Sequence, residues 1–348
     1  MTDTSRRSAS QRQTQDKEDR IRLSEALSLD ELAQILAQGC AAAKAASTRS
    51  GYADYVRQFQ EFSERRGLPS LPADAETIRF FLAEKVKGGS MASTLSKALS
   101  AIANHHRQHG HVDQTKAPTV RDFLKGRRRL EAEQGNTRRK ASLLTDDLAV
   151  LAATLDADDD RCAALRDKAL LLTQFAGGFR SGEVRSIHFA DLDFVANGLV
   201  VTLHRSKTNQ EGNPEPVLVA WGMNEQTCPV IAMAKWLEEL KGRGVTTGPV
   251  FPGLTYVPYG IRPRKKSIGK GGHWQMLKKR LKAAGLDADL YGTHSLRRGH
   301  ATQALDSGAT IEEVMTQCRW KDPKMLLLYW ERGRALMAGQ TSSGHLGL

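Results

Sequence analysis

The stretch YGTHSLRRGHATQALDSGATIEEVMTQCRWKDPKMLLLYW, residues 291–330, is the part of the chain on which its fold and chemistry depend most. Its first half predicts a short helix. Thr293 is placed to cap that helix, and Gly308 is placed to end it. His294 and Arg297 in the first turn are three residues apart, so a helix presents both side chains on one face.

The second half predicts another helix and then a tyrosine. Thr310 and Glu313 form a capping box that opens this helix, which runs to about Trp320. Pro323 restarts the chain, and an apolar run leads to Tyr329. A buried guanidinium cannot give up its proton and is costly without a partner. Cations and a ring donor on facing helices therefore predict an anion pocket, with a potential nucleophile toward phosphorus just beyond it.

Length and charge narrow the class of protein. A chain of 348 residues predicts two domains. Its formal charge of +12 indicates a polyanionic partner. Residues 1–25 predict a disordered tail, because they are polar and lack the apolar core of a signal peptide. No apolar run is long enough to span a bilayer, and the four scattered cysteines indicate neither a zinc site nor a disulfide framework. We expect a cytoplasmic, nucleoid-associated protein.

Residues 26–134 predict an all-helical, DNA-binding domain built as a bundle with short connections. The expected helices cover 28–46, 47–66, 74–87, 91–108 and 120–134. Their polar positions are rich in Lys and Arg, most densely near the end of the last helix and just after it. Nucleic-acid contact explains this density better than a solvated face does. The candidate DNA-binding residues are Arg127, Arg128, Arg138, Arg139 and Lys140.

A polar, glycine-containing linker is expected at 135–143, and residues 144–348 predict a second domain that is mostly α with a small antiparallel β-sheet. The first expected helix begins near Thr145, and a short helix capped by Ser181 is expected as well. The other expected helices cover 161–175, 229–240 and 272–284. The expected strands are 199–203 and 217–220. We interpret the acidic run 158–160 as a solvated turn. The sequence GKGG at 269–272 indicates a flexible loop.

Six residues of this second domain have the chemistry that phosphodiester transfer needs: Arg180, Lys207, His294, Arg297, Trp320 and Tyr329. Two guanidiniums can fork onto the non-bridging oxygens of a phosphate and stabilise the charge that grows there in the transition state. A tyrosine, with a pKa of about 10, needs a base or a cationic field to attack. The leaving 5′ oxygen needs a proton, which a lysine on a hairpin can supply.

The ordered set resembles the tyrosine recombinase, or phage integrase, family. The motifs are GGFRSGE at 177–183, RSKT at 205–208 and HSLRRG at 294–299, followed by Trp320 and Tyr329 nine residues later. The specific resemblance covers residues 144–335. Many relatives carry His where Trp320 stands.

This resemblance implies a C-shaped clamp around double-stranded DNA and a homotetramer on two synapsed sites, with no metal and no cofactor. Arg180 and Arg297 would hold the scissile phosphate, supported by Glu183. Lys207 would be the general acid, and His294 would assist proton transfer. Trp320 would donate its indole N–H to the phosphate and pack the helix of the nucleophile. The last of the six, Tyr329, would form a 3′-phosphotyrosyl intermediate on the way to a Holliday junction.

Several alternatives stay open at this stage. A type IB topoisomerase or a telomere resolvase uses similar chemistry, and a DNA-binding regulator could have lost catalysis. Lys265 and Lys266, also expected in a loop, compete with Lys207. Tyr291 competes with Tyr329, although it precedes the HSLRRG motif. Taken singly, each motif also has a structural explanation, such as a helix-start ion pair or core packing.

Overall fold

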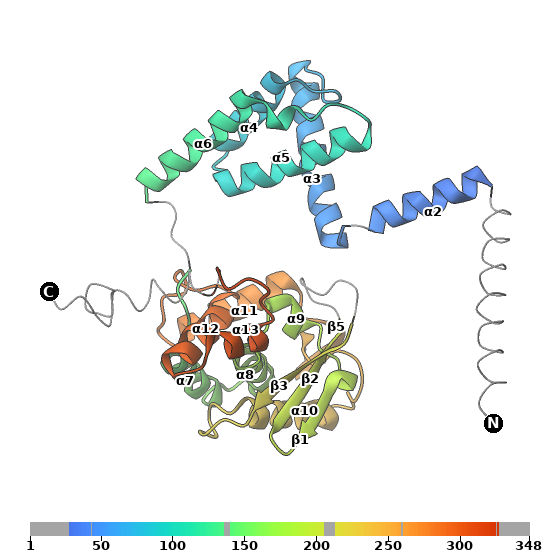
Figure 1. Ribbon diagram of the computed structural model, residues 1–348. Helices are drawn as coiled ribbons and strands as arrows, with labels where there is room; N and C mark the ends of the chain where they lie inside the picture. The colour runs from blue at the N-terminus through green and yellow to red at the C-terminus, as the bar shows by residue number, and fades with distance from the viewer. Residues whose placement is uncertain are drawn as a thin grey trace, which may run out of the picture. The chain divides into compact units, whose positions relative to one another are not determined.

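The computed structural model describes residues 28–42, 44–135, 140–204, 213–258, 260–324 and 326. The chain divides into two compact units, Met1–Arg138 and Arg139–Leu348, which we call the N-terminal and C-terminal units (Figure 1). The division falls within the stretch 135–143. No helix in the described part of the chain is both long and apolar enough to cross a membrane.

Helices are the regular structure of the described part of the N-terminal unit, which contains no strand. Its elements are α2 (Leu29–Ala42), α3 (Ala46–Arg66), α4 (Ala75–Lys87), α5 (Ala92–Gln108), the 3₁₀ turn η1 (Gln114–Lys116) and α6 (Pro118–Glu133). Phe59 and Phe81 meet edge to face at 5.1 Å in its core, which α3, α4, α5 and α6 share. Each predicted helix is present, and α6 begins two residues early because proline suits the first turn of a helix.

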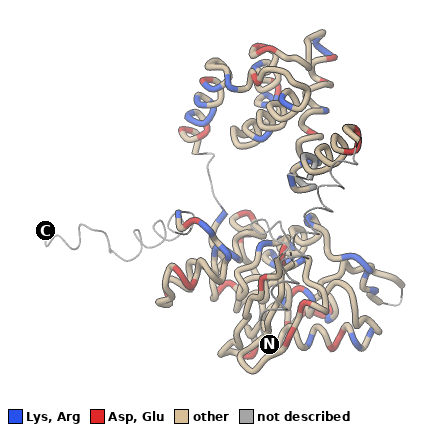
Figure 2. Tube along the Cα trace, turned by 45° about the vertical axis from the view of Figure 1, so that its right-hand side comes forward, with Lys and Arg blue, Asp and Glu red and all other residues tan. Residues whose placement is uncertain are grey.

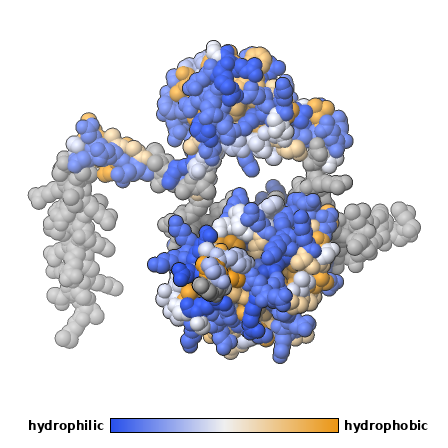
Figure 3. All heavy atoms as spheres, turned by 180° about the vertical axis from the view of Figure 1, so that it is seen from behind, coloured by the Kyte–Doolittle hydropathy of each residue, from blue (hydrophilic) through white to orange (hydrophobic). Residues whose placement is uncertain are grey.

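α2 differs from its neighbours because its apolar side chains are exposed. Leu29, Ile35 and Leu36 lie on its surface, and Figure 3 shows hydrophobic patches along this helix. Ser28 and Glu31 form a capping box at its start, with the Ser28 backbone N–H 2.8 Å from the Glu31 carboxylate. The sequence therefore specifies the helix, but its apolar face has no partner among the described residues.

The C-terminal unit packs helices around a central one. Its helices are α7 (Thr145–Asp156), α8 (Arg161–Ala176), α9 (Ser181–Arg185), η2 (Phe189–Asp191), α10 (Pro229–Gly242), α11 (Lys270–Ala283), α12 (Ser295–Asp306) and α13 (Ile311–Cys318). α8 is buried on nearly all sides and contacts α7, α10 and α12 (Figure 1). A helix buried all round needs apolar residues on every face, as the run ALLLTQFA at its end supplies.

The strands form two antiparallel sheets, where we expected one. β1 (Leu192–Val195), β2 (Gly198–Leu203) and β3 (Glu215–Ala220) make the first sheet, and β4 (Pro252–Val257) and β5 (Gly260–Ser267) make the second. Both predicted strands are present as β2 and β3. The sequence did not predict β5, because the segment GIRPRKKS is mostly polar and contains a proline.

Two of the expected loops are structured. Asp160 caps α8 by accepting a hydrogen bond from the Ala163 N–H, and Asp158 pairs with the buried Arg280, so the acidic run is more than a solvated turn. The segment GKGG is not a loop, because Gly269 is the N-cap of α11 and the next three residues form its first turn. Neither sequence has the apolar periodicity that marks a packed segment.

Residues 140–143 lie along α12. The Leu143 N–H donates to the Ser295 carbonyl at 3.1 Å, and Leu143 is fully buried. Gly299 of α12 makes this approach possible, since a Cβ built on it would lie 1.7 Å from the Leu143 carbonyl oxygen. The glycine of the HSLRRG motif thus has a packing role.

We predict that Gly299→Ala lowers the free energy of unfolding of the C-terminal unit by at least about 2 kcal/mol, because the methyl group must displace a backbone carbonyl. All five tryptophans lie in this unit, so urea unfolding followed by tryptophan fluorescence measures it. Gly242→Ala is the control, since a Cβ there meets no atom within 4 Å. Equal stability of the two variants would contradict the packing role of Gly299.

Candidate active site

Arg180 lies in the turn that joins α8 to α9. Gly177 and Gly178 precede it, and Gly178 has a φ of 55°, in the left-handed region that favours glycine. A Cβ on Gly178 would lie 2.8 Å from the Sγ of Cys318, so this turn packs closely against the end of α13. Arg180 is the N-cap of α9, a position that we had expected Ser181 to take. The turn therefore brings Arg180 beside α13.

The carboxylate of Glu183 joins three arginines. Its side chain is only 3% exposed. Oε1 accepts a hydrogen bond from Nη1 of Arg180 at 2.6 Å, and Oε2 accepts one from Nη2 of Arg319 at 2.8 Å. Nη1 of Arg297 lies 3.6 Å from the same Oε2. We call these three arginines and Glu183 the arginine cluster.

Glu183 is ionised at neutral pH. Burial alone raises the pKa of its carboxyl group, but Arg319, the Arg180 backbone N–H and the Arg180 guanidinium together hold the pKa below its ordinary value of 4.5. The Arg180 N–H donates to Oε2 at 2.8 Å, which also satisfies the start of α9. One carboxylate thus serves as helix cap and as counter-ion.

Arg297 approaches the cluster from the first turn of α12. Its side chain is 4% exposed, and Nη1 donates to the Gly178 carbonyl at 2.6 Å. Nη2 donates to the Cys318 carbonyl. Burial lowers the pKa of this guanidinium to about 10, so it stays charged at neutral pH. Arg297 therefore bridges the Arg180 turn and the end of α13.

His294 is exposed and is itself the N-cap of α12, so it precedes the first turn, where we had expected it. Thr293 does not cap the helix. Its carbonyl instead accepts a hydrogen bond from the Gln174 amide at 2.9 Å, and the same amide donates to the Phe179 carbonyl at 3.3 Å. Gln174 thus ties the chain before His294 to the chain before Arg180.

Trp320 follows α13 and lies against Arg297. The Arg297 guanidinium carbon is 5.0 Å from the centre of the Trp320 ring, a cation–π contact. Trp320 is half-buried. The structure thus brings together Arg180, Glu183, Arg297 and Trp320, with His294 three residues before Arg297.

Four candidate residues lie outside the described parts of the chain. These are Lys207, Tyr329, Arg138 and Arg139. Their roles remain predictions. The strands β2 and β3 lie on either side of Lys207 in the sequence. They pair in antiparallel register from Gly198 with Ala220 to Leu203 with Glu215. The predicted hairpin pairing is therefore confirmed up to the residues that flank its tip.

The other candidate DNA-binding residues differ in their freedom to reach a phosphate. Arg128 is exposed and donates a hydrogen bond to the Ser96 hydroxyl at 3.1 Å, whereas Arg127 is half-buried and lies 3.9 Å from the Glu131 carboxylate. Lys140 is exposed, and its Nζ donates to the Asp289 carbonyl at 2.5 Å. Figure 2 shows Lys and Arg following one another along α6. Arg128 and its exposed neighbours on this helix remain the best candidates for phosphate contact.

The structure describes the residues that compete with Lys207 and Tyr329. Lys265 and Lys266 lie in β5, which pairs with β4, and not in a loop as we had expected. The Tyr291 hydroxyl donates to the Asp147 carboxylate at 3.2 Å. Burial and this carboxylate raise the pKa of Tyr291, which disfavours the phenolate that a nucleophile needs.

Sequence reasoning missed two residues of the site, Arg319 and Gln174. Gln174 carries a local signal, because it is a buried amide in the mostly apolar run that ends α8, whereas Arg319 is marked only by its place directly before the candidate Trp320. A polar side chain at a position that the pattern assigns to the core needs a partner, and here the partner is the site.

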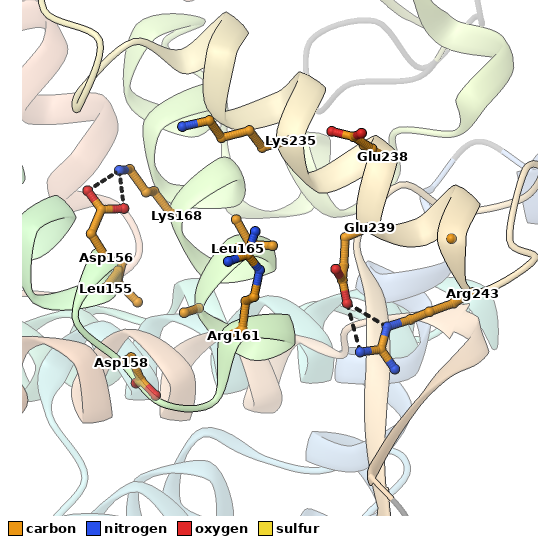
Figure 4. A pocket seen from close by; sticks show the side chains of 12 residues that line it. Leu155, Asp156, Asp158, Arg161, Leu165, Lys168, Lys235, Glu238, Glu239 and Arg243 are labelled. Atoms are coloured by element: carbon orange, nitrogen blue, oxygen red, sulfur yellow. Dashed lines mark hydrogen bonds and ion pairs between the residues drawn. The ribbon is translucent and has the colours of Figure 1, made fainter.

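A separate cavity of about 830 Å³ lies among α7, α8 and α10, as Figure 4 shows. Four of its charged side chains pair with one another: Lys168 with Asp156 at 2.6 Å and Arg243 with Glu239 at 2.7 Å. None of its lining residues belongs to the arginine cluster. The candidate site is therefore the cluster and not this cavity.

The cluster has the composition of an anion-binding site. Its guanidiniums outnumber its carboxylate, and their remaining N–H groups are donors only. Arg180 is the most exposed of the three, with 16% of its side chain accessible. An anion with several oxygens, such as a phosphodiester, matches these donors in charge and in geometry.

Comparison with known proteins agrees with this chemistry. Residues 143–333 match the Phage integrase family. An integrase/recombinase XerD homolog of Selenomonas ruminantium is 32% identical over 294 residues, which cover 83% of each chain. A putative integrase/recombinase, y4rA, of Sinorhizobium fredii is 25% identical over 76% of this chain and 58% of its own.

Solved structures share the fold. A lambda integrase dimer bound to a COC′ core site superposes with a TM-score of 0.56 at 16% identity, covering 88% of this chain and 77% of its own. The XerH site-specific recombinase bound to its difH substrate gives a TM-score of 0.55 at 14% identity, covering 84% and 78%. The mostly helical fold with small antiparallel sheets is confirmed.

We predict that Glu183→Gln lowers the free energy of unfolding of the C-terminal unit by about 3 kcal/mol at pH 7, because the guanidiniums lose their counter-ion. Since the folded-state pKa of Glu183 lies below 4.5, its contribution is full above that pH and is lost as pH falls through the folded value. The gap between variant and wild type should therefore narrow below pH 4.5.

Urea unfolding followed by tryptophan fluorescence from pH 7 to pH 3.5 measures this gap, and urea is preferred because guanidinium salts screen ion pairs. A gap that stays constant over that range would show that the Glu183 charge does not hold the cluster together.

Proposed function

The chain belongs to the phage integrase family and is a site-specific DNA recombinase of the tyrosine type, and we propose that Tyr329 is its nucleophile. DNA is its substrate. The observation that carries the assignment is the meeting of Arg180 and Arg297 at one carboxylate, Glu183, at 2.6 and 3.6 Å. Two guanidiniums gathered in this way can grip one phosphate from two sides.

The proposed reaction conserves the energy of the bond that it breaks. The phenol oxygen of Tyr329 attacks the scissile phosphorus, a 3′-phosphotyrosyl bond forms, and the bond to the 5′ oxygen breaks. His294 assists removal of the phenol proton, and Lys207 gives a proton to the leaving 5′ oxygen. A 5′ hydroxyl from a partner strand then attacks the phosphotyrosine, releases Tyr329, and produces a Holliday junction.

The phosphate is held by the residues that the cluster gathers. Arg180 and Arg297 stabilise the negative charge that the non-bridging oxygens gain in the transition state. Trp320, which packs on Arg297 at 5.0 Å, donates its indole N–H to one of these oxygens. Glu183 keeps the guanidiniums in place without contacting the DNA.

We expect Tyr329→Phe to bind the recombination site with the affinity of the wild type but to form no covalent protein–DNA complex, because only the nucleophilic oxygen is removed. The substrate is flanking DNA from the native locus, nicked so that the cleaved strand diffuses away and traps the intermediate. Denaturing gel electrophoresis measures the complex. A covalent complex with the variant would exclude Tyr329, and its absence from the wild type would favour a regulator without catalysis.

We also propose that four copies assemble on two synapsed sites. α2, with Leu29, Ile35 and Leu36 exposed, is an apolar surface that a second copy can cover. The variant Tyr329→Phe cannot cleave, so its complex with DNA stays at the stage before cleavage. The mass of this complex in an analytical ultracentrifuge measures the stoichiometry. Four copies with two duplexes are expected, and one copy per duplex would reject the assembly.

We expect Lys207→Ala to cleave ordinary DNA at least about 100-fold more slowly than the wild type, the usual scale of a lost general acid. A substrate with sulfur in place of the bridging 5′ oxygen should restore the rate, because a thiol of pKa about 8.5 leaves without protonation.

Lys265→Ala and Lys266→Ala are matched controls on β5, and both should cleave ordinary DNA normally. If the sulfur substrate fails to rescue Lys207→Ala, or rescues one of these controls instead, the assignment of the general acid is wrong.

A further inference from the structure

Arg319 has an unusual backbone conformation. It follows α13 with φ 53° and ψ 49°, and it is the one residue other than glycine with a positive φ in the described part of the chain. Glycine usually takes this position after a helix, because other L-residues pay about 1 kcal/mol for it. An arginine here needs a compensating interaction, and its side chain makes several.

The Arg319 side chain is 8% exposed and points into the Arg180 turn. Nη2 donates to Oε2 of Glu183 at 2.8 Å, and Nη1 lies 3.3 Å from the Gly177 carbonyl oxygen. The guanidinium carbon is 5.0 Å from the centre of the Phe179 ring. These partners all lie within the seven residues that carry Arg180, so Arg319 fastens the end of α13 to that segment.

The sharing of Glu183 explains what this contact achieves. Arg319 and the Arg180 backbone N–H occupy Oε2, both at 2.8 Å, while Arg297 stays 3.6 Å away. Arg297 donates instead to the Gly178 and Cys318 carbonyls. Without Arg319, Oε2 would be open to a direct hydrogen bond from Arg297. The positive charge of Arg297 would then be paired with this carboxylate and not with a phosphate.

We propose that Arg319 is a positioning residue of the recombination site: it occupies Glu183 so that Arg297 stays available to phosphate, and it sets Trp320 over Arg297. This inference rests on the proposed roles of Arg180 and Arg297. Arg319 does not itself contact the DNA, because its guanidinium is buried against protein carbonyls and a carboxylate. Trp320 is the next residue, so the left-handed backbone conformation of Arg319 sets the direction in which the Trp320 side chain leaves the backbone.

Arg319→Gly separates positioning from structure. Glycine accepts the left-handed conformation more easily than arginine, so the turn itself is not strained by the change. We expect the single-turnover rate of covalent complex formation, at saturating protein, to fall about 100-fold, as for a misplaced reacting group. Affinity for the DNA should be unchanged. Arg319→Lys, which keeps the charge but not the fork, should recover part of the rate.

Lys321→Gly is the matched control, an exposed cation two residues away, and its saturated cleavage rate should equal that of the wild type. A wild-type rate for Arg319→Gly, or an equal loss in Lys321→Gly, would overturn the proposal. Tyr329→Phe in the same assay keeps the claims apart. A covalent complex with Tyr329→Phe would contradict the assignment of Tyr329 as the nucleophile. A wild-type cleavage rate for Arg319→Gly that still depends on Tyr329 would contradict only the positioning role of Arg319.

A double-mutant cycle with Glu183→Gln tests the route of the effect. Because Arg319 acts through Glu183, the double variant should cleave no more slowly than the slower single variant. Rate losses that multiply would mean that the two residues act independently, and the proposed linkage would be rejected.

Discussion

The site depends on one buried carboxylate that is shared by three guanidiniums. Like charges repel strongly where water is excluded, and a buried arginine cannot escape by losing its proton. Glu183, with Arg180 at 2.6 Å and Arg319 at 2.8 Å, makes their proximity possible. Because the arginines outnumber the carboxylate, the cluster keeps positive charge for a phosphate. Glu183 thus holds the three arginines together without neutralising their combined positive charge.

Small residues and backbone carbonyls let the chain build this cluster from distant segments. Gly178 admits the end of α13, and Gly299 admits the backbone of Leu143. Gln174 joins the segments before Arg180 and His294 through two carbonyls. These contacts order the backbone before any DNA arrives, which reduces the cost of ordering the site when substrate binds.

The sequence predicted the parts of the site that depend on motif order and helical spacing. Arg180 and Arg297 meet as expected, and the helices were found with small errors at their ends. His294 was misplaced by one position, because the choice between neighbouring cap residues depends on tertiary contacts. Arg319 was missed because its importance comes from a left-handed turn and a partner 136 residues away, which no local pattern reveals. The polar strand β5 was missed for the related reason that pairing, and not composition, defines it.

The most direct measurement is a structure of Tyr329→Phe bound to its recombination site. We predict that N–H groups of Arg180 and Arg297 lie within about 3.2 Å of non-bridging oxygens of the same scissile phosphate, with the Glu183 carboxylate still bound to the guanidiniums on their other side. Guanidiniums on two different phosphates, or a Glu183 carboxylate turned away from both, would contradict it.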